Sequence, residues 1–120
     1  MSAQFVWFDL TAANPDRQRE FYGELFGWTI GKAADAGRYQ AWLTDGDQPW
    51  AGITKADPAT SGRWLPYVVV DDLEASTKRA VELGASVVVE ATDGPAGTAV
   101  TIADPEGAHV ALFKPHAEMG

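Results

Sequence analysis

The sequence predicts an α+β fold made of two βαβββ modules, and two observations support this prediction. Two segments, residues 14–27 and 71–84, carry helix signals, and each follows one extended apolar segment and precedes three more. The glycines that end the two helical segments, Gly27 and Gly84, lie about half of the 120-residue chain apart. The pattern therefore favours one module present twice over a single mixed fold.

The first helical segment has a clear start and a clear end. Asn14 can cap the first turn, and Pro15 suits the first helical position because the N–H that it lacks would have no partner there. Gly27 can adopt the left-handed conformation that commonly ends a helix. Four apolar side chains share one face of this helix: Phe21, Tyr22, Leu25 and Phe26. We expect that face to pack against a sheet.

The second helical segment is a fainter copy of the first. Asp71 and Glu74 have the spacing of a capping box, and Gly84 closes the helix. The expected strands cover residues 5–11, 28–32, 38–44, 49–55, 64–70, 86–90, 98–103 and 108–114. In the first of these, Val6, Phe8 and Leu10 should face the helices, which leaves Trp7 and Asp9 on the other face of the sheet.

Composition limits the classes of protein to which the chain can belong. We expect one domain over residues 1–120, with module one at 1–55, a linker at 56–63 and module two at 64–115. The chain has no cysteine, and its net charge of −8 argues against nucleic acid and anionic membranes as partners. Because no apolar run approaches the ~20 residues of a membrane span, and the start lacks a signal-peptide pattern, we expect a cytoplasmic protein.

Three motifs resemble the vicinal oxygen chelate superfamily: FYGELFGW at residues 21–28, VDDLEA at 70–75 and DPEGAHVALF at 104–113. This superfamily includes glyoxalase I, bleomycin-resistance proteins, extradiol dioxygenases and methylmalonyl-CoA epimerase, and the chain looks most like its small glyoxalase-like members. The resemblance covers nearly the whole chain. It implies that the two modules pair into a curved mixed sheet around a cavity and that the chain forms a homodimer.

The resemblance also implies where enzymes of the superfamily hold a divalent metal. Counted from the motifs, three of these positions fall on Trp7, Leu65 and Ala111. The fourth lies in the strand at residues 49–55, which contains no acidic residue or histidine. Indole, isobutyl and methyl groups do not coordinate a hard cation. We therefore expect no metal and no cofactor.

The function expected from this reading is binding of a small hydrophobic or aromatic molecule in a cavity lined by tryptophan, as in drug-sequestering members of the superfamily. The ligand-binding residues expected are Trp7, Asp9, Trp42, Trp50, Leu65, Tyr67, His109 and Ala111. Two alternatives stay open. One is a metal-dependent lyase, epimerase or dioxygenase, and the other is a metal-free enzyme that uses Asp9 and His109 as an acid–base pair. Whether the chain is an enzyme is left open.

Overall fold

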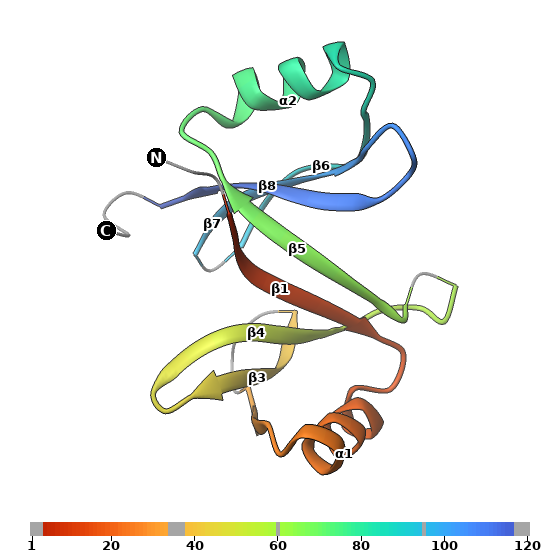
Figure 1. The fold of residues 1–120 in the computed structure, drawn as a ribbon, viewed down its shortest axis with the longest axis vertical. Coiled ribbons are helices and arrows are strands. Elements are labelled where there is room, and N and C mark those ends of the chain that lie inside the picture. The colour runs from red at the N-terminus through yellow and green to blue at the C-terminus, as the bar shows by residue number, and fades with distance from the viewer. Residues whose placement is uncertain (1–3, 34–37, 60, 95, 117–120) are drawn as a thin grey trace. The chain divides into compact units, whose positions relative to one another are not determined.

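The computed structural model describes residues 4–33, 38–59, 61–94 and 96–116, and the chain divides into two compact units. One unit is Trp7–Leu65, and the other joins Met1–Val6 to Pro66–Gly120. Each unit holds one helix, three whole strands and most of a fourth strand, in the chain order βαβββ (Figure 1). The α+β fold and the two modules predicted from the sequence are therefore confirmed.

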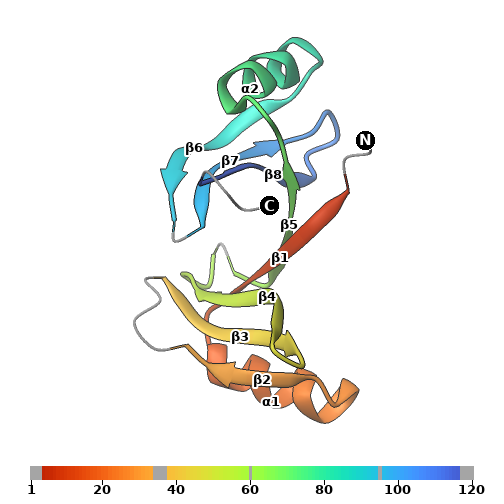
Figure 2. The same cartoon turned by 90° about the vertical axis from the view of Figure 1, so that its left-hand side faces the viewer.

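In the unit Trp7–Leu65, the helix connects the two strands that lie at opposite ends of the unit's strand order, and the last strand returns to pair with the first. Its elements are β1 (Phe5–Ala12), α1 (Pro15–Phe26), β2 (Thr29–Lys32), β3 (Tyr39–Asp45) and β4 (Gln48–Lys55). The strand order is β2-β3-β4-β1, with antiparallel pairs β2–β3 and β3–β4 and the parallel pair β4–β1. Figure 2 shows α1 against one face of this curved sheet.

The other unit repeats this topology. Its elements are β5 (Arg63–Val69), α2 (Leu73–Glu82), β6 (Ser86–Asp93), β7 (Gly97–Ala103) and β8 (His109–Pro115). The strand order is β6-β7-β8-β5, again with two antiparallel pairs and a parallel pair, β5–β8, at the end. The repeat predicted from two helix signals is thus a repeat of sheet topology.

The helix ends follow the local signals closely. The side-chain oxygen of Asn14 accepts a hydrogen bond from the backbone N–H of Arg17 at 3.1 Å, and Gly27 ends α1 with φ of 71°. In α2 the cap is Asp72 and not Asp71, because the Asp72 carboxylate accepts from the N–H of Ala75 at 3.0 Å. The expected cap, Asp71, was therefore placed one residue too early.

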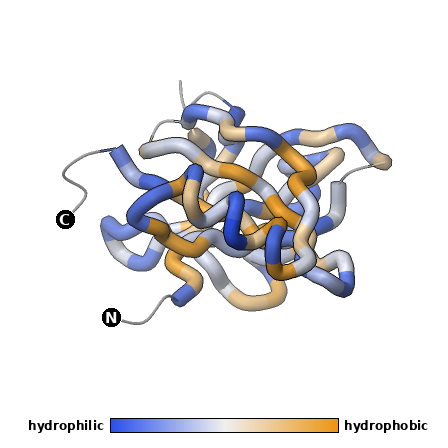
Figure 3. The backbone as a smooth tube through the Cα atoms, turned by 90° about the horizontal axis from the view of Figure 1, so that it is seen from above, coloured by the Kyte–Doolittle hydropathy of each residue, from blue (hydrophilic) through white to orange (hydrophobic). Residues whose placement is uncertain are grey.

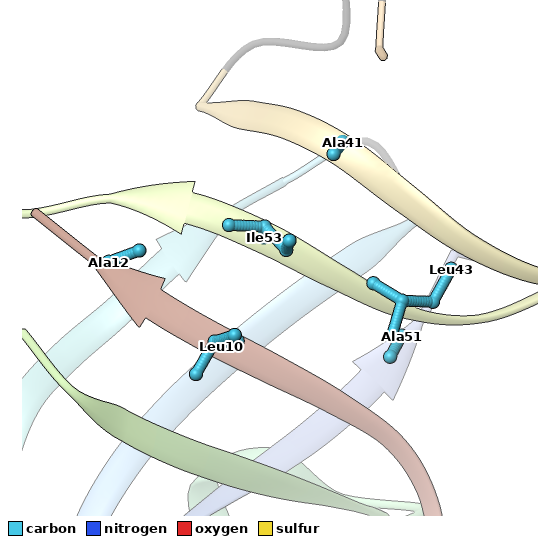
Figure 4. Packing of buried hydrophobic residues seen from close by; sticks show 6 residues of the cluster. All are labelled: Leu10, Ala12, Ala41, Leu43, Ala51 and Ile53. Carbon is cyan, nitrogen blue, oxygen red and sulfur yellow. The ribbon is translucent and has the colours of Figure 1, made fainter. Parts of the chain in front are cut away.

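The core of the unit Trp7–Leu65 lies between α1 and three strands. Its fully buried members come from β1, β3 and β4 and are Leu10, Ala12, Ala41, Leu43, Ala51 and Ile53 (Figure 4). From α1, Tyr22 packs against this cluster. The expectation that the whole apolar face of α1 packs on the sheet is wrong, since Phe21, Leu25 and Phe26 are 53%, 57% and 56% exposed.

Hydrophobic residues occur in short stretches throughout the described chain. In Figure 3, hydrophobic segments (orange) alternate with hydrophilic ones (blue) along the tube. Among the described residues, neither helix has the length and apolar character that crossing a membrane requires.

Candidate functional site

The two faces of the sheet in the unit Trp7–Leu65 differ in chemistry. Phe8 and Leu10 of β1 lie on the core side, beneath α1, as the alternation of strand residues predicts. Trp7 and Asp9 lie on the opposite face. Asp9 is only 2% exposed there, so this face carries a buried carboxylate.

Within the described part of the chain, the side chains of Trp7, Arg38 and Tyr39 donate hydrogen bonds to the Asp9 carboxylate. Its Oδ1 accepts from Nε1 of Trp7 at 2.8 Å and from the phenol O–H of Tyr39 at 2.7 Å. Its Oδ2 accepts a hydrogen bond from Nη2 of Arg38 at 3.2 Å, and the carboxylate and guanidinium form an ion pair. Burying a carboxylate is costly unless it is paired and hydrogen-bonded, and here both conditions are met. The Arg38 side chain remains 51% exposed.

The rings around Asp9 form an aromatic triad, which we define as Trp7, Tyr39 and Trp42. The Trp7 ring stands edge-on to the other two, with its centroid 6.3 Å from Tyr39 and 6.0 Å from Trp42. The Tyr39 and Trp42 rings are closer, at 4.5 Å and tilted by 35°. The Arg38 guanidinium lies 5.2 Å from the centre of the Tyr39 ring. The triad thus combines aromatic surface with one cation at its side.

Gly52 makes this arrangement possible. It lies in register between Asp9 of β1 and Trp42 of β3, on the triad's face of the sheet. A Cβ at this position would lie 2.5 Å from Cε1 of Tyr39 and 3.3 Å from Cζ2 of Trp7. The two rings therefore lie over backbone that a side chain would otherwise cover.

A β-bulge places Tyr39 in the triad. Tyr39 pairs with Thr54 and Ala41 pairs with Ile53, so Gln40 is an extra residue in β3. Simple alternation would put Tyr39 on the core face with Ala41, whereas the bulge puts it on the opposite face. Sequence reasoning missed Tyr39 and its neighbour Arg38 for this reason. A tyrosine next to an arginine at the start of a strand is too weak a signal to have found them.

A second bulge removes Trp50 from the expected site. Thr44 pairs with Pro49 and Leu43 pairs with Ala51, so Trp50 is the extra residue of β4. Its ring packs on the core side, 5.0 Å from Trp28 and 6.4 Å from Phe8. Trp50 therefore does not lie with Trp7 and Trp42, although alternation along β4 would place it there.

The other expected site residues lie mainly in the second unit. Tyr67 and Ala111 are paired neighbours on β5 and β8, and both are buried. His109 is half-buried at the start of β8, and Leu65 is half-buried on β5, in the unit of the triad. Asp9 and His109 belong to different units, so an acid–base pair formed by them stays a prediction.

The side chains present do not fit a divalent metal at the counted positions. Trp7 gives its one N–H to Asp9, and Ala111 is a buried methyl group in β8. Nowhere in the described part of the chain do three histidine, aspartate or glutamate side chains gather as a metal site requires. Asp9 itself already binds three donors. These positions therefore offer a divalent metal no set of ligands.

The proton of the Tyr39 phenol is held firmly. Burial, followed by the charge of the Asp9 carboxylate and the hydrogen bond to it, raises the pKa of Tyr39 from 10.0 to about 12, while Arg38 acts in the opposite direction. The phenol is therefore a neutral donor to Asp9 over the whole physiological range of pH.

Residues 5–113 match the family described as a glyoxalase-like domain. The chain belongs to this glyoxalase-like family, and so to the vicinal oxygen chelate superfamily that the motifs predicted. It is 31% identical to the glyoxylase-named protein CFP32 of Mycobacterium bovis over 95% of this chain, and 30% identical to the anthracycline biosynthesis protein DnrV of Streptomyces peucetius over 91%. The glyoxalase-like chain spans about half of these relatives, 46% of each.

A solved structure shows the same fold. Methylmalonyl-CoA epimerase from Mycobacterium tuberculosis superimposes with a TM-score of 0.60 at 20% identity, over 99% of this glyoxalase-like chain and 95% of that one. At this identity the likeness concerns the fold and not the reaction.

Proposed function

We propose that this glyoxalase-like chain binds a flat aromatic small molecule on the aromatic triad, with no metal taking part. The observation that carries the proposal is the presence of three rings held on the sheet face opposite the core, beside the half-exposed side chain of Arg38. Aromatic side chains with a few fixed polar groups are the usual lining of small-molecule sites.

The relative named for anthracycline biosynthesis supports a planar ligand, because anthracyclines are planar polycyclic compounds. The alternatives of the superfamily have less support from the residues. A metal-dependent lyase, epimerase or dioxygenase needs ligands where the chain has Trp7 and Ala111. An acid–base enzyme needs a carboxylate that can reach the substrate, whereas that of Asp9 already accepts three hydrogen bonds.

The test is a titration with anthraquinone sulfonate, a planar anionic probe, followed by quenching of tryptophan fluorescence. Adamantane carboxylate, which is apolar but not planar, serves as the comparison ligand. We expect the planar probe to bind more tightly. We also expect Trp42→Ala to weaken its binding about tenfold or more, since stacking on one aromatic side chain contributes ~1–3 kcal/mol to binding of a flat base.

The matched control is Trp50→Ala, which removes the same side chain from the core side of the same sheet. It should lower stability and leave the affinity of the folded protein for anthraquinone sulfonate unchanged. Equal loss of affinity in both variants, or no preference for the planar probe, would contradict binding on the triad.

A further inference from the structure

We propose that Asp9 is a positioning residue, whose carboxylate fixes the rings of Trp7 and Tyr39 and does not itself contact the ligand. This inference deepens the proposed function and rests on it for the identity of the ligand site. It differs from the sequence-based expectations that Asp9 contacts the ligand or forms an acid–base pair with His109.

The geometry at Oδ1 is the first argument. A carboxylate oxygen offers two lone pairs, and here one is used by the indole N–H of Trp7 and the other by the phenol O–H of Tyr39. One oxygen atom therefore joins two rings that stand 83° apart. A single acceptor shared in this way ties the orientation of each ring to that of the other.

The state of Oδ2 is the second argument. It accepts from Nη2 of Arg38, whose positive charge compensates that of the carboxylate. Asp9 is only 2% exposed and the Arg38 side chain is 51% exposed, so Arg38 is far more open to a ligand than the carboxylate is. The negative charge of Asp9 is thus compensated within the protein by Arg38. We therefore expect the triad to favour neutral or anionic planar molecules over cationic ones.

The hydrogen-bond donors of Trp7 and Tyr39 support the same conclusion. Tryptophan has one N–H, and that of Trp7 is given to Asp9. The O–H of Tyr39 is given to the same carboxylate, and burial with the nearby charge keeps it protonated by raising the pKa of Tyr39 to about 12. Neither donor is therefore left for a ligand. Tyr39 is itself buried, so it acts on the site by fixing the Trp7 ring, while the half-buried Trp7 and Trp42 offer the ring surface.

The experiment uses Asp9→Asn in the full chain, with three readouts. Alkaline titration by tyrosine absorbance, taken as the difference from the matching Tyr39→Phe protein, reports the pKa of Tyr39. The indole N–H resonance of Trp7, assigned with Trp7→Phe, reports its hydrogen bond. The dissociation constant for anthraquinone sulfonate reports the site. Asp45→Asn, at an exposed residue of β3, is the control for loss of one negative charge.

We expect Asp9→Asn to lower the pKa of Tyr39, to move the Trp7 indole resonance upfield and to weaken probe binding about tenfold. Asp45→Asn should change none of these. If Asp9→Asn does not fold, Arg38→Gln provides the second variant. It should leave the Trp7 resonance in place and raise the pKa of Tyr39, because Arg38 lowers that pKa.

Two results would overturn the inference. In one, folded Asp9→Asn leaves both ring readouts and probe binding as in the unaltered protein. In the other, it abolishes binding while both ring readouts stay unchanged, which would mean that Asp9 contacts the ligand. Absence of probe binding by the unaltered protein would instead contradict the proposed function, and the two ring readouts would still decide whether Asp9 positions the rings.

Discussion

The phenol of Tyr39 donates a 2.7 Å hydrogen bond to Oδ1 of Asp9 across 30 positions of sequence. Tyr39 begins β3 and Asp9 lies in the middle of β1, and β4 separates these strands in the sheet. The bond passes over Gly52 of β4, where the absence of a side chain leaves room for the Tyr39 ring. The raised pKa of Tyr39 follows in part from this contact, and so does the position of the Tyr39 ring over the backbone of Gly52.

Stability at high pH should depend on Tyr39. A pKa raised to about 12 in the folded chain, against 10.0 as the ordinary value, means that the folded state holds this proton more tightly. The resulting stabilisation, about 2–3 kcal/mol, is complete below the ordinary pKa and is lost as the pH rises through the raised one. In urea unfolding, the free-energy difference between the unaltered protein and Tyr39→Phe should shrink between pH 10 and 12. A difference that is constant across this window would contradict the assignment.

Replacing Trp7 should affect binding more than stability. Trp7 lies on the triad's face, whereas its neighbour Phe8 packs on the core. We expect Trp7→Ala to weaken anthraquinone sulfonate binding by ~1–3 kcal/mol. It should also lower the melting temperature less than Phe8→Ala does, because truncating a core aromatic costs ~3–5 kcal/mol. Equal destabilisation by the two variants, with affinity untouched by Trp7→Ala, would place Trp7 in the core.

Gly52 offers a test of how the rings lie on the sheet. A methyl group at Gly52 would meet the Tyr39 ring at 2.5 Å, so Gly52→Ala should destabilise the chain by ~1–3 kcal/mol and disturb probe binding. Gly31→Ala is the matched control. Gly31 of β2 pairs with Trp42 of β3, and no described atom lies within 4 Å of a Cβ built at Gly31. We expect the control to unfold at a denaturant concentration equal to or above that of the unaltered protein. Similar losses at both glycines would argue against close contact at Gly52.

The residues at the counted metal positions predict that the chain retains no divalent metal. Trp7, Leu65 and Ala111 offer no ligand atoms to such an ion. After dialysis against zinc, nickel, manganese and iron, elemental analysis should find well under one equivalent of each. Stoichiometric retention of any one of them would show that ligands lie elsewhere in the chain.

The homodimer expected from the superfamily stays a prediction. Large apolar side chains are exposed on α1, among them Phe21, Leu25 and Phe26, and surfaces of this kind are often covered by a partner. Light scattering at micromolar concentration should give twice the mass of one chain. A monomer mass under these conditions would contradict the expectation.

The sequence by itself determined the repeat, the ends of α1 and the face of β1 on which Trp7 and Asp9 lie. These features depend on local chemistry: Asn14 and Gly27 bound α1 through contacts within a few residues, and alternation along one strand separates Trp7 and Asp9 from Phe8. The family could be predicted for the same reason, because its motifs coincide with those helix and turn signals.

Only the tertiary structure decided which side chains share a face with Asp9. The extra residues at Gln40 and Trp50 are defined by pairing between β3 and β4, and each shifts the side-chain alternation of its strand. Because pairing depends on both strands at once, neither bulge has a signature in one strand's sequence. The first bulge brings Tyr39 to the carboxylate, and the second takes Trp50 to the core.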